Sequence, residues 1–484
     1  MAKKSAKEKA VTTPRIDLYP LIILALGVFF WMLFAKLQLF EPSNQRIVGV
    51  DPVGYYAWVH SIFWDGDLDF ENEYQTLRDA NIAIGDVSTD PNGPRSATGK
   101  LGNMFSMGPS LMWAPFLLGA HFVAEQKDGY AQPYHSAVFI ANAFYGILGV
   151  LLIYYLLKTW FDRAIALIAS LAAWLATSAF YYTYGQEAVS HTCSLFTVAL
   201  FLLLWARLRE KSGIWPWALM GAAVGLVSLV RWQDVIFVVA PTLDIFLRER
   251  HRAIPKIAAM AIASFVVFFP QMIGWKVLYG SFLTIPQGGA FMSWTRPGFI
   301  TLLFSADHGL ITWTPICALA LLGLCIAPQR LRWVFACLLV ALAIQIYVTA
   351  CAGNIGWTFG MRRLVNCTPL FALGLAALIA RLPLHRAITS TIFAIFATWN
   401  ILFAMQYSGL INEYYVGEAL ESVATENKTT VDALIQTRKL PDGTPFNLEE
   451  FVPKHLFPKG GGPTFTQFVP DKLVVLEFLV YRLF

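Results

Sequence analysis

The stretch SAVFIANAFYGILGVLLIYYLL, residues 136–157, decides the fold class of this chain. It holds no Asp, Glu, Lys, Arg or His, and it is long enough to cross a bilayer as a helix, which takes about 20 apolar residues. Basic residues follow at once, at Lys158 and Arg163. Similar runs recur between Leu18 and Tyr407, and their interiors hold almost no ionisable side chain. The sequence therefore predicts an all-α polytopic membrane protein.

Composition agrees with this prediction and limits the partners. Of 484 residues, 57% are hydrophobic and 14% are charged, whereas a soluble chain is about 45–50% apolar and about 25% charged. The net charge of +5 does not indicate nucleic-acid binding, because the excess Lys and Arg lies in short loops and in the N-terminal tail, as the positive-inside rule predicts. We expect the bilayer as a partner, and no nucleic acid.

The loops between the apolar runs are of two kinds. One kind is short and basic: residues 158–163, 207–211, 248–256, 330–332 and 381–386. The other kind is longer, aromatic and acidic, with histidines and a few arginines: residues 51–73, 187–191, 307–308 and 353–363. The positive-inside rule places the basic loops in the cytoplasm. A charge at the bilayer centre costs at least ~2.5–3.5 kcal/mol. Because the spans carry almost none, the polar chemistry is predicted at the outer membrane face.

The topology that keeps every basic loop inside has eleven crossings. Segment 109–124 would invert the later loops if it crossed; it is short and contains two prolines, so we expect a re-entrant or interfacial helix on the outer face. The tail 1–17 is then cytoplasmic and basic, 18–407 is the transmembrane domain with a first outer loop over 41–135, and 408–484 is an outer extension. The predicted crossings are 18–40, 136–157, 164–182, 191–206, 214–230, 234–247, 257–277, 308–327, 333–350, 364–380 and 387–407.

The first outer loop opens with Val50-Asp51-Pro52, and aromatic residues follow over 55–64. Asp before Pro is typical of a helix start, with Asp as the N-cap and Pro at the first helical position. The aromatic stretch suits a helix in the membrane interface. Asp51 is therefore either a helix cap alone or a carboxylate fixed near the outer surface, as a general base or a metal ligand.

Two further outer loops combine histidine with a carboxylate. Glu187 and His191 are four residues apart, so in a helix they would share a face, a spacing compatible with a divalent metal ion. The alternative is a hydrogen-bonding cluster in which Ser190 caps the next helix. Asp307 and His308 begin a later span, where Asp307 can also serve only as a cap.

The acidic stretch 65–73 resembles a calcium-binding loop. Such a loop has Gly at its sixth position and Glu at its twelfth. Counted from Asp65, these positions hold Phe70 and Thr76. A solvated acidic turn is the better interpretation.

The loop 353–363 contains three glycines and ends in Arg362-Arg363. It leads into a span that runs from outside to inside, so the N-terminus of that helix, with its free N–H groups, faces outward. Two arginines in the first turn oppose the helix dipole unless an anion lies there. Lipid phosphate is the natural anion at this depth, and Arg binds it bidentately. The alternative is a turn whose arginines contact lipid headgroups. Arg231, at the outer end of another span, is a third candidate, and its alternative is pairing with Asp234.

In their order and sidedness, these motifs resemble those of the GT-C glycosyltransferases, polytopic enzymes that take sugars from polyprenyl-phosphate donors at the outer face. They are similar to bacterial members related to protein mannosyltransferases and lipid A sugar transferases. The chain departs from many relatives in having one acidic residue at Asp51 where they have two adjacent ones; Glu187 is the best candidate for a second carboxylate. The matching stretches are Val50-Asp51-Pro52, Asp65-Gly66-Asp67-Leu68, Gly108-Pro109-Ser110-Leu111, Leu229-Val230-Arg231, His308-Gly309-Leu310 with Pro315, and Trp357-Thr358-Phe359-Gly360-Met361-Arg362.

The resemblance implies an enzyme of the bacterial inner (plasma) membrane, with a cytoplasmic N-terminus and an outer active site. It would move a sugar from a polyprenyl-phosphate donor to a lipid, glycan or protein acceptor, with inversion. Asp51 would be catalytic, and Arg362, Arg363 and Arg231 would hold the lipid phosphate. A divalent metal ion is a candidate cofactor. The alternative is a lipid or solute transporter, including a flippase, but the spans lack the polar path that it needs. A non-catalytic assembly subunit is the third interpretation.

Overall fold

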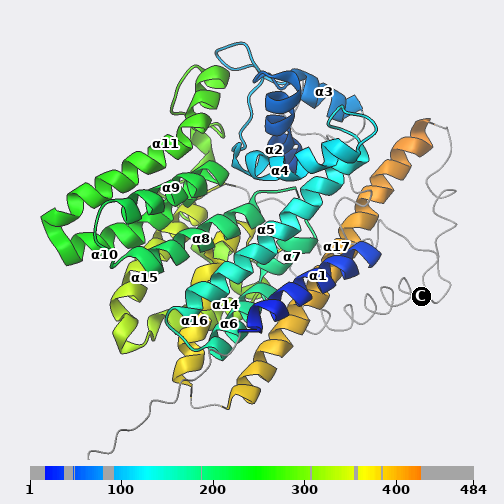
Figure 1. Ribbon diagram of the computed structural model, residues 1–484. Coiled ribbons are helices and arrows are strands. Elements are labelled where there is room, and N and C mark those ends of the chain that lie inside the picture. The colour runs from blue at the N-terminus through cyan, green and yellow to red at the C-terminus, as the bar shows by residue number, and fades with distance from the viewer. Residues whose placement is uncertain are drawn as a thin grey trace, which may run out of the picture.

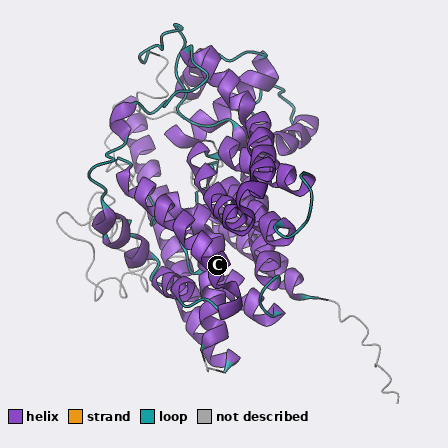
Figure 2. Cartoon of the chain, turned by 90° about the vertical axis from the view of Figure 1, so that its left-hand side faces the viewer, coloured by secondary structure: helices purple, strands orange, loops and turns teal. Residues whose placement is uncertain are grey.

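The computed structural model describes residues 17–37, 47, 49–79, 92–186, 188–305, 308–353, 358–382 and 385–426. In these residues the chain is helical, with no β-strand (Figures 1 and 2). Its elements are α1 (Tyr19–Leu37), α2 (Val50–His60), η1 (Ser61–Asp65), α3 (Glu71–Asp79), α4 (Gly108–Val123), α5 (Gln132–Lys158), α6 (Arg163–Leu175), α7 (Ser178–Tyr184), α8 (His191–Leu208), α9 (Trp215–Val230), η3 (Trp232–Val238), α10 (Val239–Glu249), η4 (Arg250–Ala253), α11 (Ile254–Tyr279), η5 (Gly289–Phe291), α12 (Phe299–Phe304), α13 (Leu310–Trp313), α14 (Ile316–Cys325), η6 (Gln329–Leu331), α15 (Arg332–Cys351), η7 (Arg362–Cys367), α16 (Thr368–Arg381) and α17 (Arg386–Glu426).

Among the described residues, seven helical segments are long and apolar enough to cross a membrane, or eight if the bent pair α6–α7 is one span. One of them, Trp232–Tyr279, contains both α10 and α11, and α9 and α14 are shorter apolar helices. Each of the eleven predicted crossings coincides with a helix or a helix pair. The all-α membrane fold is thereby confirmed, whereas the number of crossings stays a prediction.

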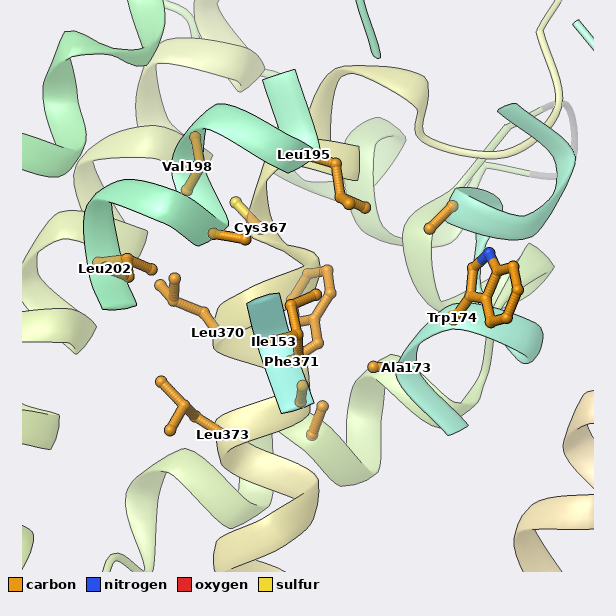
Figure 3. Close-up of a cluster of buried hydrophobic side chains, with 14 of the residues drawn as sticks. Ile153, Ala173, Trp174, Leu195, Val198, Leu202, Cys367, Leu370, Phe371 and Leu373 are labelled. Carbon is orange, nitrogen blue, oxygen red and sulfur yellow. The ribbon is translucent and has the colours of Figure 1, made fainter. Parts of the chain in front are cut away.

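The centre of the bundle is apolar and tightly packed. Helices α5, α6, α8 and α16 contribute buried side chains such as Ile153, Trp174, Leu195 and Leu370, which Figure 3 shows gathered in one cluster. Where α14 meets α16, a Cβ on Gly374 would lie 2.0 Å from the carbonyl oxygen of Ala320. Small residues therefore let these two backbones approach, as is usual between membrane helices.

Two predicted crossings are broken helices. The bend between α6 and α7 is 69°, and Thr177 begins α7 by accepting a hydrogen bond from the backbone N–H of Ala179. The predicted crossing 308–327 is divided between α13 and α14, because Pro315 has no N–H and restricts the backbone of Thr314. At such breaks, backbone groups and polar side chains lie outside regular helix, although hydropathy alone indicates a continuous helical span.

The last predicted boundary lies within a helix. We expected the transmembrane domain to end at residue 407, but α17 runs without interruption to Glu426. No proline occurs in this segment to end the helix. The rest of the predicted outer extension, 427–484, and the tail 1–16 lie outside the described residues.

All five basic loops meet at one end of the bundle. Asp162, in the first loop, pairs with Arg386 at 3.0 Å, and Arg330 donates to the carbonyl oxygen of Trp160. At the same end, the buried Asp244 accepts from Arg209 at 2.7 Å and from Arg248 at 2.9 Å, and Trp333 joins it to the fourth loop. In the sequence, the basic loops differ from the acidic ones in the sign of their charge. In the fold, the basic loops lie together at one end of the bundle.

The segment predicted as the first outer loop folds into short helices at the opposite end, near the upper edge of Figure 1. Helix α2 packs against α3 and α4, and α4 packs along α5. The predicted short helix over 109–124 is α4. Gly108 begins α4 so close to the end of α9 that a Cβ would lie 2.3 Å from the carbonyl oxygen of Leu229. This contact fixes α4 beside the backbone that carries Arg231.

Candidate functional site

Asp51 lies in the first turn of α2, with its side chain 30% exposed. The prediction that Asp51 is the N-cap is wrong: the helix begins at Val50, and Gly49, with φ of 92°, is the N-cap residue. Glycine reaches this left-handed region without a steric penalty, so it can turn the chain into the helix earlier than the Asp-Pro pair indicated. The Asp51 carboxylate is thus not committed to capping.

Arg362 pairs with Asp51 across 311 residues of sequence. Its Nη1 donates to Oδ2 of Asp51 at 3.1 Å, and its side chain is 19% exposed. Arg362 is the first residue of η7, a 3-10 turn that continues into α16. The structure therefore joins two residues that the sequence proposed separately, one as a base and one as a phosphate ligand.

Arg231 lies at the end of α9 and is buried. Its Nη1 is 2.8 Å from Nδ1 of His191, which begins α8. The alternative of an Arg231–Asp234 pair is not what the side chains form: Asp234 is buried and accepts from Ser194 and, at 2.7 Å, from Nδ2 of Asn366. Ser194, Asn366 and Asp234 are polar residues at the ends of apolar spans, and sequence reasoning gave none of them this role.

Arg363 extends the cationic group. Its Nη1 donates to the carbonyl oxygen of Gly353 at 3.1 Å, and its guanidinium lies 5.4 Å from the centre of the Phe291 ring. Arg231, Arg362 and Arg363 are all close enough to His191 to act on it electrostatically. Like charges repel strongly in a half-buried setting, so a cluster of three arginines with Asp51 favours binding of an anion.

Tyr55 connects α2 to the arginine cluster. It lies one turn after Asp51, and its hydroxyl donates to Oγ of Ser190 at 2.8 Å. Burial raises the pKa of Tyr55 to about 12, although Arg231 acts in the opposite direction. The phenol is therefore a neutral donor at physiological pH. Ser190 is the N-cap residue of α8, as predicted, but makes no side-chain capping bond.

The motif at Gly108–Leu111 and the residues just before it contact α2 and the end of α9. Ser110 donates to the carbonyl oxygen of Tyr55, and Ser106 donates to that of Val230. Both bonds are buried. Sequence analysis singled out the motif without a role; in the structure, Ser110 of the motif bonds to α2, and Ser106, just before the motif, bonds to the end of α9.

The predicted metal pair of Glu187 and His191 stays a prediction. Glu187 lies outside the described residues, α8 begins only at His191, and Ala188 has φ of 61°. The contact of His191 with Arg231 also disfavours a cation at its ring. Asp307 lies outside the described residues, and His308 is half-buried just before α13.

The interpretation of 65–73 as a solvated turn is wrong for Glu73. This carboxylate is fully buried and lies against His60, which no sequence motif singled out. A π-helical turn, η1, brings the two side chains and Asp65 together.

Known proteins support the fold. The sequence profile of the dolichyl-phosphate-mannose-protein mannosyltransferases matches residues 134–275. The structure is similar to ArnT from Cupriavidus metallidurans bound to undecaprenyl phosphate, at 11% identity and a TM-score of 0.53, covering 96% of this chain and 76% of that one. It is similar to the apo state of the same ArnT at 12% identity and a TM-score of 0.50, with the same coverage. The chain has the GT-C fold.

A third match is the archaeal oligosaccharyltransferase AglB from Archaeoglobus fulgidus, in complex with an inhibitory peptide and a dolichol-phosphate. Identity is 13%, the TM-score is 0.48, and the match covers 81% of this chain and 56% of AglB. No curated protein matches the sequence significantly. The ArnT fold confirms the predicted all-α membrane fold, and the profile match over residues 134–275 agrees with the predicted GT-C resemblance.

Proposed function

We propose that this GT-C protein transfers a sugar from a polyprenyl-phosphate donor to a lipid, glycan or protein acceptor at the outer membrane face, with inversion. The observation that carries the proposal is the Asp51–Arg362 contact of 3.1 Å within the cluster of three arginines. It puts a carboxylate beside a cationic group at the end of the bundle opposite the basic loops. ArnT, whose structure contains undecaprenyl phosphate, has the same fold.

The arginines supply the phosphate site. Arg362 and Arg363 lie in the first turn of η7, where the backbone N–H of Arg362 already donates to the carbonyl oxygen of Gly360, so the guanidinium groups supply the donors for a phosphate. Arg binds phosphate through two parallel hydrogen bonds, and charge-assisted bonds of this kind are about twice as strong as neutral ones. As the sugar leaves, negative charge grows on the phosphate, and these fixed cations stabilise it.

Asp51 supplies the base. The acceptor hydroxyl gives its proton to the Asp51 carboxylate and attacks the anomeric carbon from the face opposite the phosphate. The bond between the anomeric carbon and the phosphate oxygen breaks, and polyprenyl phosphate leaves with the bonding electrons. A single displacement inverts the anomeric centre. In this proposal, Arg362 contacts both the carboxylate that accepts the proton and the phosphate that leaves, so it holds the base and the leaving group in one geometry.

An apolar cavity that is lined in part by Trp232, the residue after Arg231, suits the isoprenoid chain. It has a volume of about 600 Å³ and is lined mainly by apolar side chains of α9, η3, α10 and α11, including Trp232 and Phe268. Trp232 directly follows Arg231 in the chain. A donor whose phosphate lies at Arg231 can therefore extend its lipid along this cavity, where burial of each CH₂ contributes about 0.8 kcal/mol.

The residues of this site fit an anion better than a divalent metal ion. Arg231 contacts His191, and Arg362 and Arg363 act on it electrostatically, while the described carboxylates nearby are Asp51, paired with Arg362, and the buried Asp234. A metal ion would add positive charge to a group that is already cationic. The proposed transfer therefore uses only the side chains of the chain itself.

The test is product formation by the purified protein in nanodiscs, with a panel of polyprenyl-phosphate sugars and membrane-lipid, glycan and peptide acceptors. Mass spectrometry follows both the glycosylated product and the released polyprenyl phosphate. We expect turnover with at least one donor and an anomer opposite to that of the donor. Movement of intact donor lipid between leaflets without sugar transfer would instead identify a flippase and overturn the proposal.

A further inference from the structure

A second polar cluster lies at the other end of α2. One ligand atom each from His60, Asp65 and Glu73 lies within 4.8 Å of the others. Asp51 and His60 are nine residues apart on one helix, which corresponds to roughly 14 Å along its axis. The cluster is therefore separate from the proposed transfer site.

Local backbone geometry assembles the cluster. In an α-helix, residues 60 and 65 would point roughly 140° apart, since successive residues turn by about 100°. The π-helical turn η1, Ser61–Asp65, widens the helix and brings the Asp65 carboxylate onto the His60 side. Nδ1 of His60 lies 3.2 Å from Oδ2 of Asp65 and 3.3 Å from Oε1 of Glu73, which comes from the first turn of α3.

The other ring nitrogen fixes the tautomer of His60. Nε2 lies 2.9 Å from the carbonyl oxygen of Asp128, which can only accept, so Nε2 carries the hydrogen. In the neutral imidazole, Nδ1 then presents a lone pair to two carboxylates. The ring is stacked on Trp64 at 5.4 Å and on Tyr130 at 4.2 Å, so it cannot turn away. A histidine that donates its distal N–H to a backbone carbonyl while its other nitrogen faces carboxylates has the usual arrangement of a metal ligand.

Glu73 provides a second, independent indication. Its side chain is 0% exposed, and its Oε2 is buried without a hydrogen-bond partner. A buried anionic oxygen with no donor is costly. Either a proton or a cation must compensate it.

We propose that His60, Asp65 and Glu73 bind a divalent transition-metal ion, with Zn²⁺ the best match. Calcium and magnesium select oxygen ligands, whereas imidazole together with carboxylates suits zinc and its neighbours. Three protein ligands leave a further position for water. Asn72 donates to Oδ2 of Asp65 at 2.9 Å and so orients this ligand from outside.

The site would join α2, η1 and α3 through a single ion. His60 ends α2, Asp65 ends η1, Glu73 lies in the first turn of α3, and the carbonyl group of Asp128 belongs to the loop after α4. Tyr56 also donates from α2 to this loop, at the carbonyl oxygen of Gly129. A bound ion would therefore stabilise the first outer loop and fix the helix that carries the proposed base at its other end.

The experiment uses the full chain, purified through a tag without histidine. The protein is stripped with a chelator, incubated with ZnCl₂ and freed of excess metal, and its zinc content is measured by mass spectrometry. We expect about one ion per chain for the parent and a higher thermal unfolding midpoint with Zn²⁺ but not with Ca²⁺. Glu73→Gln and His60→Gln should weaken binding at least tenfold. Glu71→Gln is the matched control, because Glu71 lies on the same helix but is 53% exposed and outside the cluster.

If Glu73→Gln does not fold, two measurements still decide the matter. Asp65→Asn changes a ligand that is 27% exposed, and Co²⁺ added to the stripped parent reports its ligands by absorption. Nitrogen and oxygen ligation, lost in Asp65→Asn, supports the site. A thiolate charge-transfer band, or no metal uptake by the parent, overturns the proposal. Unchanged zinc content in both His60→Gln and Asp65→Asn also overturns the proposal. A proton shared between the carboxylates would then explain the buried Glu73.

Discussion

Arg362→Ala is the most direct test of the proposed transfer site. The substitution removes a guanidinium that contacts Asp51 at 3.1 Å and that, in our proposal, also binds the donor phosphate. The side chain is 19% exposed, so water cannot fully replace it. Lysine at this position retains the positive charge but loses the planar fork that binds phosphate bidentately.

The expected magnitude follows from the bond that is lost. A charge-assisted hydrogen bond to phosphate contributes about 1.5–3 kcal/mol, which corresponds to a loss of roughly 10–150-fold in kcat/KM for the donor. Arg362→Lys should fall between this value and the parent. Arg363→Ala should have a smaller effect, because Arg363 also binds the carbonyl group of Gly353 and stacks near Phe291.

The assay measures kcat/KM against the best polyprenyl-phosphate sugar in nanodiscs, with Arg386→Ala as the matched control. Arg386 is also an arginine in an ion pair with an aspartate, at 3.0 Å from Asp162, but it lies among the basic loops and is 61% exposed. An exposed pair of this kind contributes at most about 1 kcal/mol to stability. We expect the control to turn over donor as the parent does.

A double-mutant cycle separates the two roles of Arg362. If it binds phosphate, Arg362→Ala should still cost roughly 10–150-fold in an Asp51→Asn background, because the phosphate contact does not depend on the carboxylate. If it only positions Asp51, its removal in that background should cost nothing. The second result would refute the phosphate assignment, and Arg231 would become the next candidate.

Three further predictions follow from the same geometry. Asp51→Asn should leave expression normal and lower turnover by roughly 10²–10⁴-fold, the scale of a general base; near-normal turnover would remove Asp51 from the mechanism. Gly108→Ala should lower the free energy of unfolding by about 1–3 kcal/mol, because its Cβ meets backbone of α9, whereas Gly119→Ala, in the same helix with open space around it, should be neutral or stabilising; equal thermal midpoints for both would contradict the packing argument. In a cysteine-free background, cysteines at Ser212 and Lys100 should react with an impermeant thiol reagent from opposite faces, with Lys100 outside; labelling from one face would remove the outer-face assignment.

The membrane fold was predictable because hydropathy is a local property. An apolar run such as 136–157 must form a helix in lipid, whatever its neighbours are, because only a helix satisfies its own backbone there. The sign of the loop charges is local too, and it separated the five basic loops that the structure gathers at one end. The breaks at Pro315 and between α6 and α7 were harder to predict, since short interruptions barely change the mean hydropathy.

The proposed site was predictable in its parts. Asp51, Arg231 and Arg362 stood out as charged residues beside apolar spans, but nothing in the sequence paired them. We expected Glu187 and His191 to share one helical face. This expectation assumed a helix over both residues, whereas α8 begins only at His191. The cluster of His60, Asp65 and Glu73 was missed because a spacing of five indicates one face only in a π-helical turn, and such turns have no reliable sequence signal.

The sequence by itself determined that this chain lies in a membrane and where its helices are, and it predicted which loops would carry the chemistry, because each of these inferences depends on residues close together along the chain. Only the tertiary structure decided that Asp51 meets Arg362, 311 residues away, and that Glu73 is buried against His60 instead of solvated. Contacts of this kind depend on how helices pack, through close approaches such as Gly108 against α9, and packing is set by shape complementarity over the whole bundle.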